Sequence, residues 1–163
     1  MAETPSATER IEHTVKVDAP PEAVFEYFTD PSKLAGWMGS QATLDPRPGG
    51  VCRFDVNGSK MIGEYVQVDF PWRLVFTWGW EARLFEVGEQ STCVEVSFTP
   101  EGDGTVVRLS HARLPEGAVA FHGAGWRHYL ARLAAAAAGN DPGPDPWKDP
   151  VVAIKAIQAE AER

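Results

Sequence analysis

Histidine is the residue type that could do acid–base chemistry near neutral pH, and His111 is the best placed of the four in this chain. The segment 105–113 alternates apolar and polar side chains, as a half-buried strand does. Val107, Leu109 and His111 fall on one face of it, which we expect to point toward the core. His111 is then either a buried, hydrogen-bonded histidine, which is the more common arrangement, or a polar contact or general acid/base inside a cavity.

Two further polar side chains could join His111 in such a cavity. Arg113 has the same parity and lies at the end of the strand, toward the expected mouth of the cavity. A guanidinium there could pair with a ligand carboxylate or enolate, although a solvated arginine is the more common case. Tyr65, on a separate strand, is the third candidate.

Other catalytic and metal-binding patterns are not found in the sequence. No two histidines stand at i and i+4, and no carboxylate completes a metal triad with them. The glycine-rich stretches lack the Lys-Ser/Thr pair of a phosphate-binding loop, and no serine lies in a nucleophile elbow. We therefore expect no catalytic residue, no metal and no cofactor, which favours a protein that is not an enzyme.

The periodicity of the chain predicts an α+β protein in which strands and helices are segregated. A strand over residues 12–17 comes first, and two short helices follow, the first opened by Pro20 and Pro21 and the second over residues 32–37. The later strands are expected at residues 51–56, 61–70, 73–85, 92–99 and 105–113. A long helix over residues 120–138 ends this pattern.

Three segments are expected along the 163 residues. Residues 1–9 form a disordered leader, residues 10–139 a folded domain, and residues 140–163 a Pro-rich linker with a short C-terminal helix. Trp147 is the hydrophobic anchor of the linker, and Val151, Ile154 and Ile157 are predicted to face inward from the terminal helix.

An apolar cavity is expected between the long helix and the sheet, because one helix cannot completely close a strongly curved sheet. Aromatic side chains on the inward parities could line this cavity, and each could equally well fill the core. The candidate ligand-binding residues are Trp37, Phe54, Tyr65, Phe76, Trp78, Trp80, His111, Arg113, Phe121 and Trp126. If these rings fill the volume themselves, no ligand cavity remains.

The net charge of −8 makes nucleic acid and anionic lipid poor partners. Cys52 and Cys93 do not have metal-site spacing, and the sequence leaves open whether they pair. No apolar run approaches the roughly 20 residues of a membrane helix, and the first residues lack a secretory signal. We expect a cytoplasmic protein without membrane insertion.

The start of the folded segment, residues 17–25 (Val-Asp-Ala-Pro-Pro-Glu-Ala-Val-Phe), resembles the SRPBCC or START-like superfamily. Further features resemble its AHSA-type branch, named after the activator of the Hsp90 chaperone ATPase. They are Trp37, Gly49-Gly50, residues 63–66 (Gly-Glu-Tyr-Val), residues 71–78 (Pro-Trp-Arg-Leu-Val-Phe-Thr-Trp) and Gly125-Trp126. The resemblance covers about residues 10–139. It implies a helix-grip fold, in which a curved antiparallel sheet is wrapped around a long C-terminal helix with an internal hydrophobic cavity.

The resemblance implies no single reaction, since the superfamily includes lipid and hormone carriers, polyketide aromatase/cyclases and proteins that sequester reactive natural products. We favour binding of a hydrophobic small molecule, such as a lipid, a polyketide or an aromatic natural product, because few polar groups converge. One alternative is a polyketide cyclase that uses His111, Arg113 and Tyr65. The other is a protein-interaction or stress-response module that uses the apolar groove or the Trp147 tail. An edge strand could also pair two copies into a homodimer.

Overall fold

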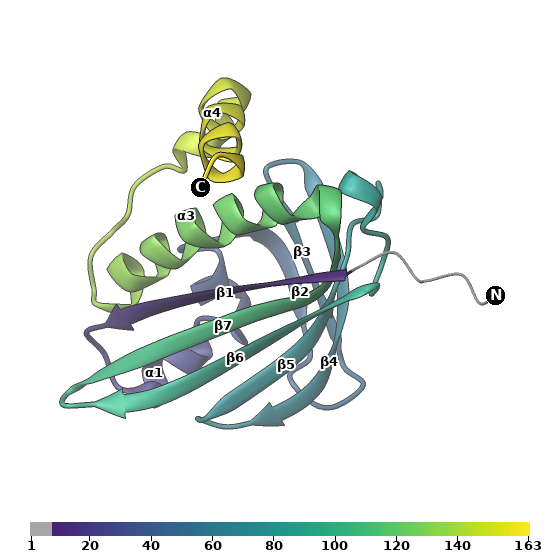
Figure 1. Cartoon of the computed structure of the whole chain (residues 1–163). Helices are drawn as coiled ribbons and strands as arrows, with labels where there is room; N and C mark the ends of the chain where they lie inside the picture. Colours follow the sequence, from purple (N-terminus) through teal and green to yellow (C-terminus); the bar gives the residue numbers. More distant parts are fainter. Residues whose placement is uncertain (1–7) are drawn as a thin grey trace.

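A seven-stranded antiparallel sheet curves around one long helix in the computed structural model of this chain, which describes residues 8–163 (Figure 1). The strands are β1 (Thr8–Val17), β2 (Ser40–Leu44), β3 (Val51–Val56), β4 (Ser59–Asp69), β5 (Arg73–Trp78), β6 (Thr92–Glu101) and β7 (Gly104–Pro115). Their spatial order is β1-β7-β6-β5-β4-β3-β2. The predicted leader, residues 1–9, lies outside the described residues except for its last two, which begin β1.

Four α-helices accompany the sheet in the described part of the chain. They are α1 (Pro21–Glu26), α2 (Pro31–Leu34), α3 (Val119–Ala137) and α4 (Pro150–Ala161), with 3₁₀ turns at Leu84–Glu86, Glu116–Ala118 and Pro146–Lys148. α3 crosses the concave face of the sheet, and α4 packs on α3 from the other side (Figure 1). This arrangement confirms the predicted helix-grip, α+β fold.

Strict alternation of side chains explains the central strands. Val94, Val96 and Phe98 on β6 are buried, whereas the residues between them are partly exposed. The hairpin between β3 and β4 turns at Asn57 and Gly58, whose φ angles are 51° and 93°. Both values are positive, as the tight two-residue hairpin turn requires, and Asn and Gly are the residues that adopt such angles most readily.

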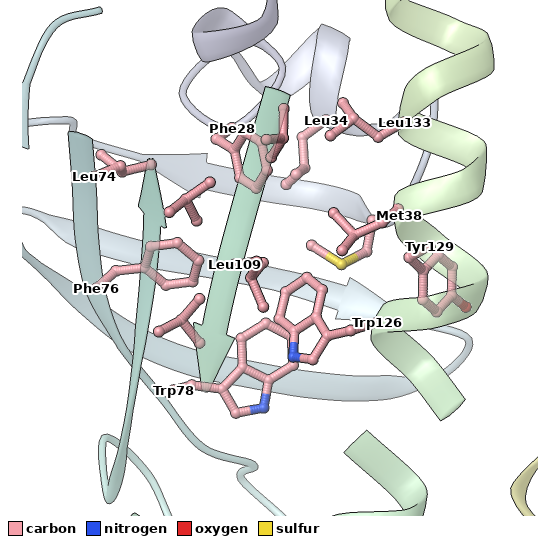
Figure 2. Packing of buried hydrophobic residues seen from close by; sticks show 14 of the residues in the cluster. Phe28, Leu34, Met38, Leu74, Phe76, Trp78, Leu109, Trp126, Tyr129 and Leu133 are labelled. Carbon is pink, nitrogen blue, oxygen red and sulfur yellow. The ribbon is translucent and has the colours of Figure 1, made fainter. Parts of the chain in front are cut away.

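The core lies between the concave face of the sheet and the inner face of α3 (Figure 2). Trp126, Leu130 and Leu133 stand three or four residues apart, so they share one side of the helix and are all buried. Leu74 and Phe76 meet them from β5. Burying each such side chain contributes about 1.5–3 kcal/mol, which makes this layer the main source of stability.

Two differences from the predicted elements have physical causes. The strand expected to run to residue 85 ends at Trp78, because the chain must pass very close to Gly88 at the next residue. A Cβ on Gly79 would lie 1.8 Å from the Gly88 carbonyl oxygen, so the backbones touch there. The short edge strand β2 was not predicted; it pairs with β3 only at its two ends, around a register shift.

Candidate functional site

A pocket of about 170 Å³ lies beside α3, between the end of β5, the β3–β4 turn and the C-terminal segment. Its walls come from segments far apart in the sequence. The lining residues are Met38, Val56, Asn57, Ser59, Trp78, Trp80, Leu84, Phe121, His122, Gly125, Trp126, Tyr129, Trp147 and Ala153. Most of them are apolar or aromatic, as expected for a small-molecule site, but the volume is below the roughly 300–1,000 Å³ of ordinary ligand pockets.

Four of the ten predicted ligand-binding residues line this pocket: Trp78, Trp80, Phe121 and Trp126. Four other predicted residues, Trp37, Phe54, Tyr65 and Phe76, are buried in the core and are not among the lining residues. His111 is fully buried and also outside the pocket wall, and Arg113 is on the surface.

Ring packing explains why the pocket is smaller than the predicted cavity. The Trp78 ring lies 5.1 Å from Trp126, 5.3 Å from Trp80 and 5.7 Å from Phe54, measured between centroids. These are ordinary contact distances for tilted or edge-to-face aromatic pairs. The rings therefore fill most of the space between sheet and helix, and only the end near Trp80 and Phe121 stays open.

His111 is held in a closed hydrogen-bond network. Its Nδ1 accepts from Trp126 Nε1 at 3.0 Å, and its Nε2 lies 2.7 Å from Thr92 Oγ1. An indole nitrogen only donates, and the Thr92 hydroxyl donates to the Trp78 carbonyl, so the proton of His111 must be on Nε2. Burial, with a smaller effect of nearby His122, holds the pKa of His111 well below 6.5. Of the two roles considered from the sequence, His111 therefore has the more common one: it is a buried, hydrogen-bonded histidine and not a general acid/base inside a cavity.

His122 is a pocket residue that sequence reasoning missed. Its Nε2 accepts from Trp80 Nε1 at 3.1 Å, and its Nδ1 donates to the Ala118 carbonyl at 2.8 Å. Burial lowers its pKa to about 4, so the ring is neutral at pH 7. The signal was available, because His122 stands four residues before Trp126, on the inward side of the same helix.

The indole nitrogen of Trp78 lacks the hydrogen-bond acceptor that other buried tryptophans have in the described structure. Trp78 is 4% exposed, and its Nε1 finds no hydrogen-bond acceptor anywhere in residues 8–163. The nitrogens of Trp37, Trp80 and Trp126 all have acceptors within 3.1 Å. A buried donor without a partner is rare in native proteins and calls for an explanation.

Arg113 is a solvated arginine, the more common of its two predicted cases, and it does not lie at the pocket although it shares the parity of His111. The pairing of β1 with β7 shifts register beside Arg113, whose φ angle is 66°, so the alternation breaks at that point. Arg113 is exposed, and Leu114 takes the inward position instead. Alternation alone cannot reveal such a bulge.

The hydroxyl group of Tyr65 is also engaged in a hydrogen bond away from the pocket. Its hydroxyl donates to the Phe28 carbonyl at 3.0 Å, and burial raises its pKa above the ordinary value of 10. Tyr65, His111 and Arg113 therefore do not meet in one cavity. The geometry that a cyclase mechanism with these three groups requires is absent from the described structure.

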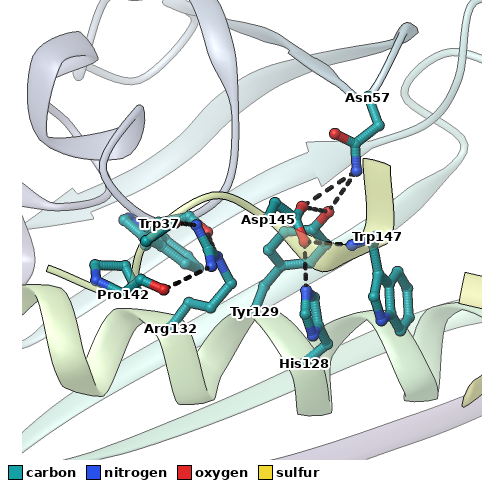
Figure 3. A network of polar contacts seen from close by, with 9 residues as sticks. Trp37, Asn57, His128, Tyr129, Arg132, Pro142, Asp145 and Trp147 are labelled. Atoms are coloured by element: carbon teal, nitrogen blue, oxygen red, sulfur yellow. Dashed lines mark hydrogen bonds and ion pairs between the residues drawn. The ribbon is translucent and has the colours of Figure 1, made fainter. Parts of the chain in front are cut away.

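A polar network around Asp145 joins three residues of the pocket wall, Asn57, Tyr129 and Trp147 (Figure 3). The Asp145 carboxylate accepts from Tyr129 Oη at 2.6 Å, from His128 Nε2 at 2.7 Å, from the Trp147 backbone at 2.9 Å and from Asn57 Nδ2 at 3.2 Å. Burial alone would raise the pKa of Asp145, but these hydrogen bonds together outweigh it and lower the pKa to about 2. The carboxylate is charged at any physiological pH and ties the linker to α3 and the β3–β4 turn.

The same linker is held by two further contacts. Trp147 stacks on His128 with ring centroids 4.4 Å apart and an angle of 7° between the planes, as the predicted anchoring role requires. Arg132 donates to the Gly143 carbonyl at 2.9 Å and to the Trp37 carbonyl at 3.1 Å (Figure 3). The linker therefore crosses α3 in a fixed path and brings Trp147 to the pocket.

The inward face predicted for the terminal helix is wrong for two of its residues. Val151 and Ile154 are 57% and 52% exposed, and only Ile157 is half-buried. The side that meets α3 carries Glu160, which accepts from Arg127 Nε at 2.8 Å. Ala153 lies seven residues earlier, on the same side of the helix, and lines the pocket.

Metal binding and membrane insertion each require a recognisable arrangement of side chains or helices. Within residues 8–163, His, Cys, Asp and Glu side chains nowhere gather in a group of three that could hold a metal ion. The described helices include none that is long and apolar enough to cross a membrane. Cys52 and Cys93 are both free thiols, which answers the question that the sequence left open.

Comparison with known structures supports the fold. An AHSA1-like protein from Rhizobium etli, solved by NMR, is 39% identical, with a TM-score of 0.72 over 90% of this chain and 92% of that one. CalU16 from Micromonospora echinospora is 25% identical, with a TM-score of 0.69 over 99% of this chain and 94% of that one. DynU16, a protein of the dynemicin biosynthetic locus, is 28% identical, with a TM-score of 0.66 over 77% of this chain and 45% of that one.

A search of curated proteins finds no match. A family model does match, over residues 18–138, which is most of the chain and includes the whole sheet except β1. Its description is activator of Hsp90 ATPase homolog 1-like protein. The resemblance inferred from the sequence motifs is confirmed, and this chain belongs to the AHSA1-like family.

Proposed function

We propose that this protein binds a hydrophobic small molecule in the pocket beside α3, without catalysing a reaction. The observation that supports this most directly is the wall itself. Trp78, Trp80, Phe121 and Trp126 converge on one opening, and the polar groups among them are neutral and mostly hydrogen-bonded within the protein. Such a wall provides apolar burial and shape, and it offers no nucleophile or charged acid–base pair.

The size of the pocket restricts the ligand. An engineered protein cavity of about 150 Å³ holds a benzene molecule, so a pocket of about 170 Å³ accommodates one ring or the end of a larger molecule. A lipid, polyketide or aromatic natural product larger than this would enter with one end, or would need the C-terminal segment to move. DynU16, from the dynemicin biosynthetic locus, is a reason to include aromatic natural products in the test panel.

The test is a titration of intrinsic tryptophan fluorescence with fatty acids, flavonoids, polyketides and single-ring aromatics. We expect saturable quenching, since four tryptophans line the pocket. The decisive variant is Gly125→Leu. A Cβ at Gly125 would meet nothing within 4 Å, so the new side chain should occupy the pocket while leaving the fold intact.

Gly117→Leu is the matched control, since it adds the same side chain in open space at an exposed position that does not line the pocket. Binding should be lost in Gly125→Leu and kept in Gly117→Leu, with both variants folded as judged by thermal unfolding. If folded Gly125→Leu binds as the wild type does, the ligand does not occupy this pocket and the proposal is wrong.

Homodimerisation stays a prediction. β1 and β2 are the two edges of the sheet, and either could pair with a second copy. Measurement of the molecular mass in solution, at several protein concentrations, will decide between one chain and two.

A further inference from the structure

The unsatisfied indole N–H of Trp78 identifies the chemistry of the ligand. This nitrogen is buried, belongs to a residue of the pocket wall, and has no acceptor in residues 8–163. The neighbouring indoles of Trp80 and Trp126 use histidine nitrogens as acceptors. Trp78 has no equivalent, because His111 and His122 each use both ring nitrogens in other hydrogen bonds. An acceptor for Trp78 must therefore come from outside residues 8–163.

The charges around the pocket select among possible acceptors. No Lys or Arg is found among the described residues that line it. Tyr129 and Asn57, which do line it, both donate to the Asp145 carboxylate. A ligand carboxylate would therefore lose its hydration, meet no cation and lie near an anion, which is strongly unfavourable. A cation cannot satisfy a donor, because it has no lone pair to accept the hydrogen bond.

We propose that the pocket takes a neutral, ring-sized aromatic compound that carries a hydrogen-bond acceptor, such as a carbonyl, ether or phenol oxygen, and that Trp78 Nε1 donates to this oxygen. The inference rests on the proposed function and names the class of ligand for the same site. The aromatic wall supplies apolar contact for the ring, and the hydrogen bond from Trp78 fixes its orientation. A hydrocarbon of the same shape would leave the Trp78 donor unpaired and would bind more weakly.

Two probes of nearly the same shape test this directly. Acetophenone has a carbonyl oxygen, and α-methylstyrene has a CH₂ group in its place. Each is titrated into protein labelled with ¹⁵N, and the indole N–H signals of the six tryptophans are followed by NMR. We expect acetophenone to bind roughly tenfold more tightly, as one additional hydrogen bond to a buried donor allows. The Trp78 indole proton should move downfield with acetophenone and not with α-methylstyrene.

Trp78→Phe keeps an aromatic ring and removes the donor, so the two probes should then bind with equal affinity. Trp72→Phe is the matched control, because Trp72 is 48% exposed and lies outside the pocket wall, and it should leave the tenfold difference intact. If Trp78→Phe does not fold, the shift of the assigned Trp78 indole proton in the wild-type protein decides alone. Benzoate, which is anionic at pH 7, should bind at least tenfold more weakly than acetophenone.

The outcomes separate this inference from the proposed function. Equal binding of acetophenone and α-methylstyrene, with no selective shift of the Trp78 indole, overturns the acceptor inference and leaves hydrophobic binding intact. Tighter binding of benzoate than of acetophenone also overturns it. If neither neutral probe moves any pocket resonance at millimolar concentration, both the inference and the assignment of a ligand to this pocket are contradicted.

Discussion

Mild acid should destabilise this protein strongly, because two buried histidines are held neutral in the folded state. His122 has a pKa of about 4, and the pKa of His111 is well below 6.5. Their rings lie 5.1 Å apart among tryptophan and phenylalanine rings, and neither forms a hydrogen bond or ion pair with a carboxylate. The folded protein therefore offers a proton on either ring nothing to offset the lost hydration.

The direction and size of the effect follow from proton linkage. Unfolded histidine titrates near 6.5, so below that pH the unfolded chain takes up protons that the folded chain does not. The stabilisation is complete above pH 6.5 and is lost as the pH falls toward 4. At pH 5 the folded state keeps His122 unprotonated about 1.5 pH units below its unfolded pKa, which costs about 2 kcal/mol out of a total of about 5–15 kcal/mol for a typical domain. The lowered pKa of His111 adds a further loss in the same direction.

Denaturant unfolding, followed by tryptophan fluorescence at pH 7, 6 and 5, measures this loss. Carboxyl groups titrate mainly below this range, so histidines dominate it. His122→Gln is the informative variant, because an amide can accept from Trp80 and donate to Ala118 without titrating. It should lose about 2 kcal/mol less stability than the wild type between pH 7 and pH 5. Half-buried His13, whose pKa is lowered by burial and by Arg127, contributes equally to both proteins and cancels in the comparison. A free energy of unfolding that is the same at pH 5 and pH 7, or a pH dependence that His122→Gln does not reduce, would refute this reasoning.

Two further predictions concern the backbone and the tail. Gly79→Ala should lower the free energy of unfolding by about 3 kcal/mol, because the new Cβ would meet a backbone oxygen at 1.8 Å. Gly117→Ala places its Cβ in open space and should change the free energy of unfolding by less than about 0.5 kcal/mol in the same thermal or denaturant assay. Asp145→Ala should release the C-terminal segment. The lowered pKa of the Asp145 carboxyl corresponds to about 1–2 kcal/mol of stabilisation after allowance for solvent screening. Amide hydrogen exchange in α4 should therefore become roughly tenfold faster, while exchange in β6 stays unchanged. Unchanged exchange in α4 would show that other contacts hold the tail.

Much of the fold could be predicted because its signals are local. The alternation in β6 and β7 and the three-to-four residue spacing along α3 each depend on one stretch of sequence. The break at Arg113 could not be predicted, because a bulge depends on how two strands pair. The orientation of α4 is set by its contacts with α3, among them the ion pair between Arg127 and Glu160, and no local pattern reveals such contacts.

The candidate site was predictable only in part, for a related reason. Parity separates inward from outward residues, and it placed both Phe76 and Trp78 inside correctly. It does not tell which inward rings touch one another and which border a void, because that depends on strand order and on the path of the tail. Trp147 and His122 were therefore missing from the predicted set, although both line the pocket.

The segment after α3 contributes to the pocket wall but hardly to the hydrophobic core. None of the residues in the last 3₁₀ turn or in α4 is buried, so this segment adds little to the core, yet Trp147 and Ala153 form part of the pocket wall. It also lies outside the span matched by the family model. Under the proposed function, substitutions in this segment should change ligand affinity and the rate of ligand dissociation at little cost to the stability of the core. The tail is then the part of the chain in which ligand preference can diverge while the folding core is left untouched.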